Sequence, residues 1–144
     1  MLISKLLDLK GRAVATIGPD ETVADALRAL SEHGIGALVV ASDGRHIEGI
    51  LSERDIVRAL GTRGPALTED RVDSLMSTEV VSCLPDGTVE DLMSVMTMRR
   101  IRHVPVLDKN GELCGIVSIG DVVKTRIDEL EKDRRELVDY INAR

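Results

Sequence analysis

Two stretches of the chain place a serine three positions before an aspartate, directly after a short apolar run. One reads Gly-Ile-Leu-Ser-Glu-Arg-Asp and ends at Asp55, and the other reads Gly-Ile-Val-Ser-Ile-Gly-Asp and ends at Asp121. Unsatisfied N–H groups at a helix start attract phosphate, and a serine hydroxyl there adds another donor. An aspartate would repel phosphate, but its carboxylate can accept hydrogen bonds from two vicinal ribose hydroxyls. Ser52 with Asp55 and Ser118 with Asp121 are therefore candidate nucleotide contacts.

The same spacing also has a purely structural interpretation. A serine or threonine followed three residues later by an acidic residue forms a capping box, and Thr22 with Asp25 and Thr88 with Asp91 show this pattern too. On chemistry alone, capping as the only role is the favoured interpretation of all four pairs. The two serine pairs differ because a glycine and a strand precede them without an intervening loop. This places them at a sheet edge, where ligands tend to bind.

The two serine pairs belong to a longer internal repeat. At a constant offset of 66 positions, fourteen identical pairs run from Leu9 and Leu75 to Val57 and Val123 without a gap. Ordinary residue usage predicts about one match in fifteen positions, so this density indicates a duplication. The sequence is expected to fold as two similar halves.

Each half is predicted to contain the same elements. Short strands are expected over residues 13–17 and 79–83, followed by helices that begin after Thr22 and Thr88 and end near Gly34 and Arg100. Hairpins follow, formed by residues 37–41 with 47–51 and by residues 103–107 with 113–117. The order is β-α-β-β-α in each half. It predicts an α+β fold in which two pseudo-twofold-related halves pack through their sheets.

Domain boundaries are assigned from this pattern. The first half takes residues 1–62 with the N-terminal segment, the second half takes residues 72–124, and residues 63–71 are expected to form an exposed linker. Residues 125–144 are a C-terminal helical extension, too short for a sustained coiled coil. We predict that it forms a dimer or partner surface, with packing on its own module as the alternative. Its apolar residues recur at helical spacing, together with those just before it: Val123, Ile127, Leu130, Leu137, Val138 and Ile141.

Length, charge and composition exclude several classes of function. The chain has 144 residues, whereas a catalytic (β/α)₈ barrel takes about 250. A formal net charge of −6 and a single aromatic residue, Tyr140, argue against binding to nucleic acid or to anionic membranes. No apolar window long enough for a membrane span and no signal-peptide layout are found. We therefore predict a cytoplasmic protein.

No pattern of catalytic or metal-binding residues is found. His33, His46 and His103 are scattered, and neither a Ser-His-Asp arrangement nor a phosphate-binding loop occurs. Cys83 and Cys114 lie singly in apolar runs, which predicts buried reduced thiols rather than a zinc or redox site. We expect no catalytic residue, no metal and no enzyme activity.

A tandem β-α-β-β-α repeat with Gly-h-h-Ser-x-x-Asp at the last strand-to-helix junction resembles the cystathionine β-synthase (CBS) domain pair, also called a Bateman module. The resemblance covers residues 13–123 and includes Arg102-His103-Val104-Pro105-Val106, which is similar to the strand motif of the second domain. The first half departs from the pattern, because Gly36-Ala37-Leu38-Val39-Val40 lacks the basic pair and the proline.

The resemblance implies a sensor rather than an enzyme. Such modules bind AMP, ADP, ATP, NAD(H) or S-adenosylmethionine in two clefts between the domains. They commonly stack as homodimeric discs and act on an effector protein. The resemblance therefore implies a regulatory adenosine-containing ligand, with AMP as the first candidate, together with a homodimer and an effector. The alternative is a structural dimerisation module whose clefts stay empty.

The resemblance also assigns residues of both halves to each cleft. The first cleft would combine Ser52, Asp55, Val80, Val81, Ile101, Arg102 and His103. Arg102 and His103 would meet phosphate, which makes this the preferred phosphate site, although His103 is equally well interpreted as a satisfied strand residue. The symmetry-related cleft, which lacks the basic pair, would combine Ser118, Asp121, Val14, Ala15, Ile35, Gly36 and Ala37. Arg54 would lean toward this second cleft, with a solvated surface position as its alternative.

Overall fold

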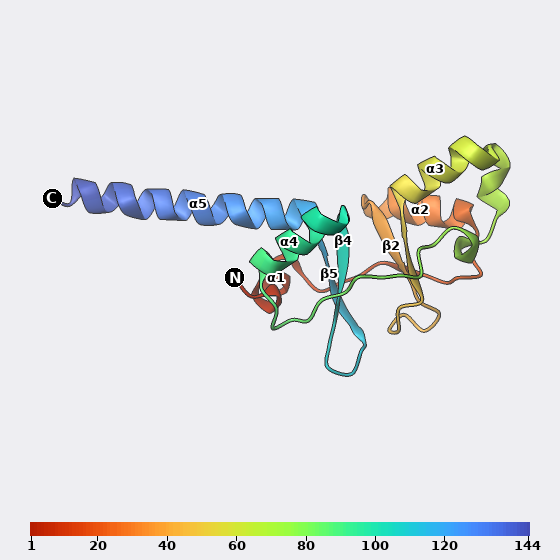
Figure 1. The fold of residues 1–144 in the computed structure, drawn as a ribbon, viewed down its shortest axis with the longest axis horizontal. Coiled ribbons are helices and arrows are strands. Elements are labelled where there is room, and N and C mark those ends of the chain that lie inside the picture. The colour runs from red at the N-terminus through yellow and green to blue at the C-terminus, as the bar shows by residue number, and fades with distance from the viewer.

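The computed structural model describes residues 1–144 and shows two halves side by side, with one long helix projecting from them (Figure 1). The first half contains β1 (Thr16–Ile17), α2 (Val23–His33), β2 (Ala37–Val40), β3 (Gly49–Ser52) and α3 (Glu53–Arg63). Two 3₁₀ helices follow, η1 (Pro65–Glu69) and η2 (Val72–Ser74). The second half contains α4 (Val89–Arg99), β4 (His103–Leu107), β5 (Leu113–Ser118) and α5 (Ile119–Asn142), and α1 (Ile3–Lys10) precedes both halves.

The two predicted hairpins are confirmed. Strands β2 and β3 pair antiparallel, and β1 joins them in parallel to give the order β1-β2-β3. Strands β4 and β5 also pair antiparallel, with an irregularity between Val106 and Leu107. The α+β fold class with a repeated hairpin and a long C-terminal helix is therefore confirmed.

The first predicted strand of each half is shorter than expected. In the first half the ladder contains only Thr16 and Ile17, and in the second half residues 79–83 form a single parallel bridge between Cys83 and Val106. The prediction of a strand over residues 79–83 is wrong, and a proline explains why. In the first half the Val39 N–H donates to the Ala15 carbonyl, at 3.3 Å. The corresponding residue 66 positions later is Pro105, which has no N–H to donate.

The helices α2 and α4 begin and end where the sequence predicts. Thr22 caps α2 through a complete capping box, and Thr88 caps α4 by accepting from the Asp91 N–H. At the C-terminal ends Gly34 and Arg100 both take the left-handed conformation, with φ angles of 60° and 53°. Glycine adopts this conformation freely, whereas Arg100 is the only non-glycine residue of the chain with a positive φ.

Each half has its own hydrophobic core, and each core is completed by a segment outside the repeat. The second-half core contains Val104 and Val117 and is closed by Ile3, Leu6 and Leu7 of α1. The first-half core is closed by residues that follow α3. Helix α1 therefore packs with the second half although it precedes the first half in the chain. The domain division at residues 62 and 72 stays a prediction. The packing of α1 with the second half does not follow that division.

The connection between the halves is not simply exposed. Leu67 in η1 is 1% exposed and Val72 in η2 is fully buried, and both lie in the first-half core. The expectation of an exposed linker is therefore wrong at Leu67. Its local sequence has no periodic apolar pattern because a single 3₁₀ turn buries only one side chain.

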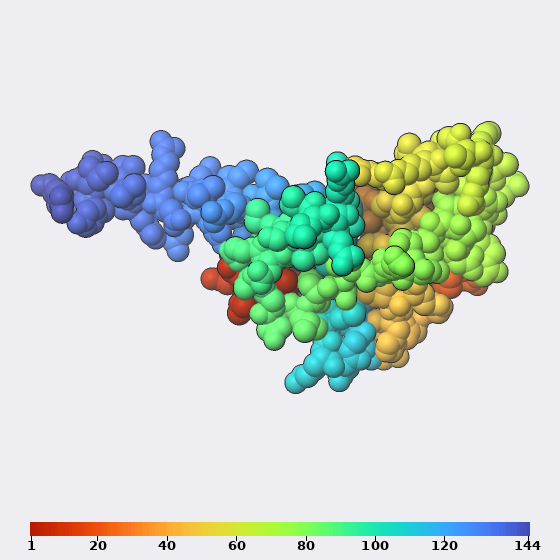
Figure 2. Space-filling view, viewed as in Figure 1, coloured from red at the N-terminus to blue at the C-terminus, as the bar shows by residue number.

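Helix α5 is one continuous helix of 24 residues and includes the predicted C-terminal extension. Only Val122 and Thr125, near its start, are buried. Figure 2 shows the rest of the helix standing clear of the two halves. Neither α5 nor any other helix combines the length and the apolar character needed to cross a membrane.

Candidate ligand-binding clefts

The two serine–aspartate pairs form the same local structure. Ser52 and Ser118 are the N-cap residues of α3 and α5, and each hydroxyl accepts from the backbone N–H of the aspartate at 3.2 Å. In return, Oδ2 of Asp55 and Oδ2 of Asp121 accept from the serine N–H at 2.9 Å. Both pairs are therefore capping boxes, as is Thr22 with Asp25.

Capping leaves part of each aspartate available. Oδ1 of Asp55 and Oδ1 of Asp121 accept no hydrogen bond from the protein. An ionised carboxylate offers about four lone-pair sites, so one cap bond does not exhaust it. The structural and the ligand-binding interpretations are therefore compatible, because the cap holds the carboxylate through Oδ2 and leaves Oδ1 without a hydrogen bond from the protein.

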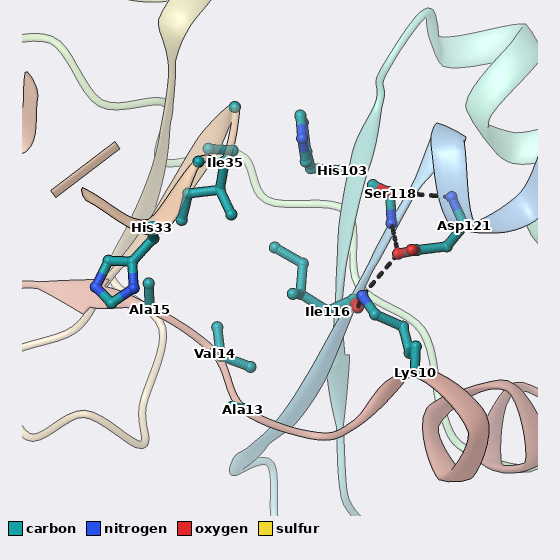
Figure 3. Close-up of a pocket in the computed structure, with 13 residues that line it drawn as sticks. Lys10, Ala13, Val14, Ala15, His33, Ile35, His103, Ile116, Ser118 and Asp121 are labelled. Carbon is teal, nitrogen blue, oxygen red and sulfur yellow. Dashed lines mark hydrogen bonds and ion pairs between the residues drawn. The ribbon is translucent and has the colours of Figure 1, made fainter. Parts of the chain in front are cut away.

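A cavity of about 500 Å³ lies between the halves beside Asp121. Figure 3 shows Val14, Ala15 and Ile35 of the first half facing Ile116, Ser118 and Asp121 of the second. All seven residues that we assigned to this cleft line the cavity together: Val14, Ala15, Ile35, Gly36, Ala37, Ser118 and Asp121. Its walls carry small and branched apolar side chains next to one carboxylate, which suits a flat apolar group attached to a polyol.

The sequence did not indicate that Lys10 lines this cleft. The ammonium of Lys10, the last residue of α1, donates to Asp121 Oδ2 and to the Ile116 carbonyl, both at 2.6 Å. The side chains of Lys10 and Asp121 are only 26% and 24% exposed. Burial alone would raise the pKa of Asp121, but hydrogen bonds from Lys10 and from the Ser118 backbone outweigh it and lower that pKa. Lys10 therefore gives this cleft a basic side chain that the sequence did not assign to it, in place of the missing basic pair.

His103 also lines the Asp121 cavity, although the resemblance assigned it to the other cleft. It lies opposite Ser118 in the β4–β5 ladder. A Cβ at Gly36 would lie 3.3 Å from His103 Cε1, so the backbone of the first half approaches the imidazole closely. Burial lowers the pKa of His103 below its ordinary value of 6.5, against the opposing effect of Glu53. The imidazole is therefore neutral at neutral pH.

The remaining predicted residues do not line the Asp121 cavity. Arg102 and Arg54 are exposed and form no ion pair, whereas Val80, Val81 and Ile101 are half-buried. The residue corresponding to Lys10 by the repeat offset is Met76. Met76 lies against Gly49, because a Cβ at that glycine would come within 2.6 Å of its sulfur. Met76 thus takes the position against Gly49 that Leu7 takes against Gly115, and Asp55 forms no ion pair where Asp121 pairs with Lys10.

The two cysteines are less buried than predicted. Both Cys83 and Cys114 are free and half-buried, so the expectation of buried thiols is met only in part. Burial, together with the nearby Cys114, raises the pKa of Cys83 to about 11, so this thiol stays protonated at neutral pH. A protonated thiol is a poor nucleophile and a poor metal ligand.

The repeat architecture can be compared with known proteins. A sequence model of the CBS domain matches residues 8–62 and 72–128. The chain belongs to the CBS-domain family. The tandem repeat and the family resemblance found in the sequence are thus confirmed.

Relatives cover most of the chain. A solved CBS-domain protein from Agrobacterium tumefaciens is 46% identical, with a TM-score of 0.83 over 88% of this chain and 99% of that one. The mitochondrial CBS domain-containing protein CBSX3 of Arabidopsis thaliana is 36% identical over 86% of this chain, which spans 62% of CBSX3. A CBS-domain protein from Pyrobaculum aerophilum, solved in complex with AMP, is 27% identical, with a TM-score of 0.74 over 84% of this chain and 89% of that one.

Proposed function

We propose that this chain is a regulatory module that binds an adenosine-containing nucleotide, AMP first, in the clefts between its two halves. The observation that carries the proposal is the cavity of about 500 Å³ beside Asp121. Residues of both halves line it, so a ligand there contacts both at once. The similarity to a CBS-domain protein solved with AMP supports adenosine as the ligand class.

The geometry indicates how each part of a nucleotide would be held. The two oxygens of the Asp121 carboxylate accept the two ribose hydroxyls, while Ile35 and Ile116 enclose the base. Ser118 already uses its hydroxyl as the acceptor of the cap, so its remaining proton can be donated to the ligand. Asp55 with Ser52 offers the same groups at the other junction.

Helix α5 provides a route from ligand to partner. Its first turn contains Asp121, and the same helix extends without interruption to Asn142. A ligand that changes the angle between the halves therefore moves the far end of the helix, provided that it binds one arrangement more tightly than another. We propose that an effector or a second copy of the chain contacts this helix.

Titration calorimetry tests the binding sites. Asp121→Ala should lose most AMP affinity if its cavity is the main site, whereas Asp55→Ala should lose it if the Asp55 junction dominates. Our sequence-based ranking favours Asp55. Losing a charged hydrogen-bond acceptor should weaken binding by about tenfold or more. Asp25→Ala, which breaks a capping box away from both clefts, is the matched control and should leave affinity unchanged. Unaltered binding in both cleft variants would contradict the proposal.

A row of exposed apolar side chains along α5 favours dimerisation as a second candidate function. Val123, Ile127, Leu130 and Leu137 follow one another at steps of four, three and seven residues, and they are 47–60% exposed. This spacing places them along one face of the helix, and a second copy of α5 would bury that face.

Light scattering tests the dimer directly. Leu130→Glu combined with Leu137→Glu should reduce the particle mass to that of one chain, because two carboxylates cannot be buried unpaired. Lys132→Glu is the control, since it adds negative charge at a side chain that is 77% exposed. A mass that is the same in wild type and in the double variant would exclude this surface as the interface.

A further inference from the structure

We propose that Lys10 competes with the ligand for the Asp121 carboxylate and thereby makes the Asp121 cleft selective for adenosyl ligands that carry a phosphate. The inference rests on the proposed function, since it concerns which members of that ligand class the cleft accepts. It starts from an ion pair that lies inside the cavity itself.

The lone pairs of Asp121 show the competition. Oδ2 accepts two hydrogen bonds, one from the Ser118 N–H at 2.9 Å and one from Lys10 Nζ at 2.6 Å. A carboxylate oxygen has about two acceptor sites, so Oδ2 is saturated. A ribose diol that places one hydroxyl on each oxygen must therefore displace Lys10. At Asp55 the corresponding oxygen accepts only the Ser52 N–H, so a diol can bind without displacing any protein group.

The packing of α1 keeps the Lys10 ammonium close to this carboxylate. Leu7, one turn earlier in the helix, is fully buried in the second-half core. It lies directly against Gly115 of β5, where a Cβ would come within 2.7 Å of Leu7 Cδ2. The end of α1 is thus fixed beside β5, and only the flexible side chain of Lys10 needs to move when a ligand enters.

Charge decides which ligands can displace Lys10 at low cost. Lys10 is the only lysine or arginine that lines the cavity, and the imidazole of His103 is neutral there at neutral pH. An uncharged nucleoside would break the ion pair and leave a half-buried ammonium with the Ile116 carbonyl but without an anionic partner, which is unfavourable. A phosphate on the ligand gives the displaced ammonium a new partner, because lysine acts as a mobile point charge.

Calorimetric titration in an Asp55→Asn background isolates the Asp121 cleft. With Lys10 present, AMP should bind at least about tenfold more tightly than adenosine, a difference of about 1.4 kcal/mol. Lys10→Met removes the charge and keeps an unbranched side chain. It should tighten adenosine binding and weaken AMP binding, so that the tenfold preference disappears. Lys10→Arg retains the positive charge and should restore the preference for AMP.

One control variant and one second neutral variant complete the experiment. Lys5→Met removes a charge from the same helix outside the cavity and should leave the AMP-to-adenosine ratio unchanged. Lys10→Gln serves as a second neutral variant if Lys10→Met fails to fold. An AMP-to-adenosine ratio that is the same with lysine, methionine and glutamine at position 10 would overturn the inference while leaving the proposed function intact. Absence of binding by both ligands to every variant and to the wild type would overturn both.

Discussion

The two halves repeat the same motif but surround it with different chemistry. At Asp121 the neighbouring segment supplies Lys10, whose ammonium bonds to the Ile116 carbonyl. At Asp55 the corresponding segment pairs through its backbone instead, because Ile50 and Ser77 exchange two hydrogen bonds of 3.0 and 2.9 Å. The duplicated strand and cap fix the position of the aspartate. The segment that packs beside the strand, which ends at Lys10 in one case and contains Ser77 in the other, determines whether the carboxylate has a charged partner.

The same contrast holds for the cores. Helix α1 closes the second-half core, whereas the irregular segment around Leu67 and Val72 closes the first. Each half therefore depends on residues that the repeat does not include. Substitutions of buried residues in the two closing segments should therefore lower stability, whereas substitutions of their exposed neighbours should not.

The largest expected effect comes from Leu7→Ala. Leu7 is fully buried, so its truncation should lower the free energy of unfolding by about 2–5 kcal/mol. Leu9→Ala on the same helix is the control, because Leu9 is 71% exposed and its loss should change stability by less than about 0.5 kcal/mol. Urea unfolding measures both. Equal effects would show that α1 does not belong to the second-half core.

A smaller effect is expected where two segments cross most closely. Gly49→Ala places a Cβ within 2.6 Å of the Met76 sulfur and 2.9 Å of the Ser77 carbonyl oxygen, so the paired backbone must move. Such overpacking should cost about 1–3 kcal/mol. Gly61→Ala lies in α3 with open space around it and should instead stabilise the protein by up to about 1 kcal/mol. Chemical denaturation distinguishes the two signs, and a neutral Gly49→Ala would contradict the close crossing.

The smallest expected effect is a pH dependence from His103. Burial lowers the pKa of this imidazole below 6.5, so the unfolded chain binds more protons than the native chain between the two values. The free energy of unfolding contributed by His103 therefore rises as the pH increases through that window. His46 titrates in the opposite sense, because Asp43 raises its pKa.

The difference in unfolding free energy between the wild type and His103→Gln isolates the contribution of His103. Wild type minus His103→Gln, measured from about pH 5 to about pH 7, should show a difference in stability that grows with pH. His46→Gln provides the matched comparison and should give a slope of opposite sign. A flat difference for His103→Gln would show that the imidazole is not desolvated in the cleft.

Much of the fold could be predicted because its signals are local. The caps at Thr22 and Thr88, the two hairpins and the fourteen repeated positions all follow from neighbouring residues or from one constant offset. The shortened strand at residues 79–83 is explained by Pro105, but only once its pairing partner is known. Leu67 gave no signal, since a single buried side chain in a short turn has no periodicity.

The residues of the candidate site likewise include some that the sequence predicts and some that it does not. Ser118, Asp121 and the apolar wall were predicted from the motif and the family resemblance. Lys10 was not, because it lies 111 positions away from Asp121 and belongs to no motif. The position of His103 was also missed, since its contact with Gly36 depends on how the halves approach each other. Contacts between distant segments set the charge of the cleft, and a single sequence does not show them.

A crystal structure of the protein with AMP tests the central claim most directly. We expect AMP between the two halves, with its ribose hydroxyls on the Asp121 carboxylate and Lys10 moved from Oδ2 to the phosphate. AMP bound away from both Asp121 and Asp55, or bound beside Asp121 while Lys10 keeps its 2.6 Å contact with Oδ2, would contradict this account.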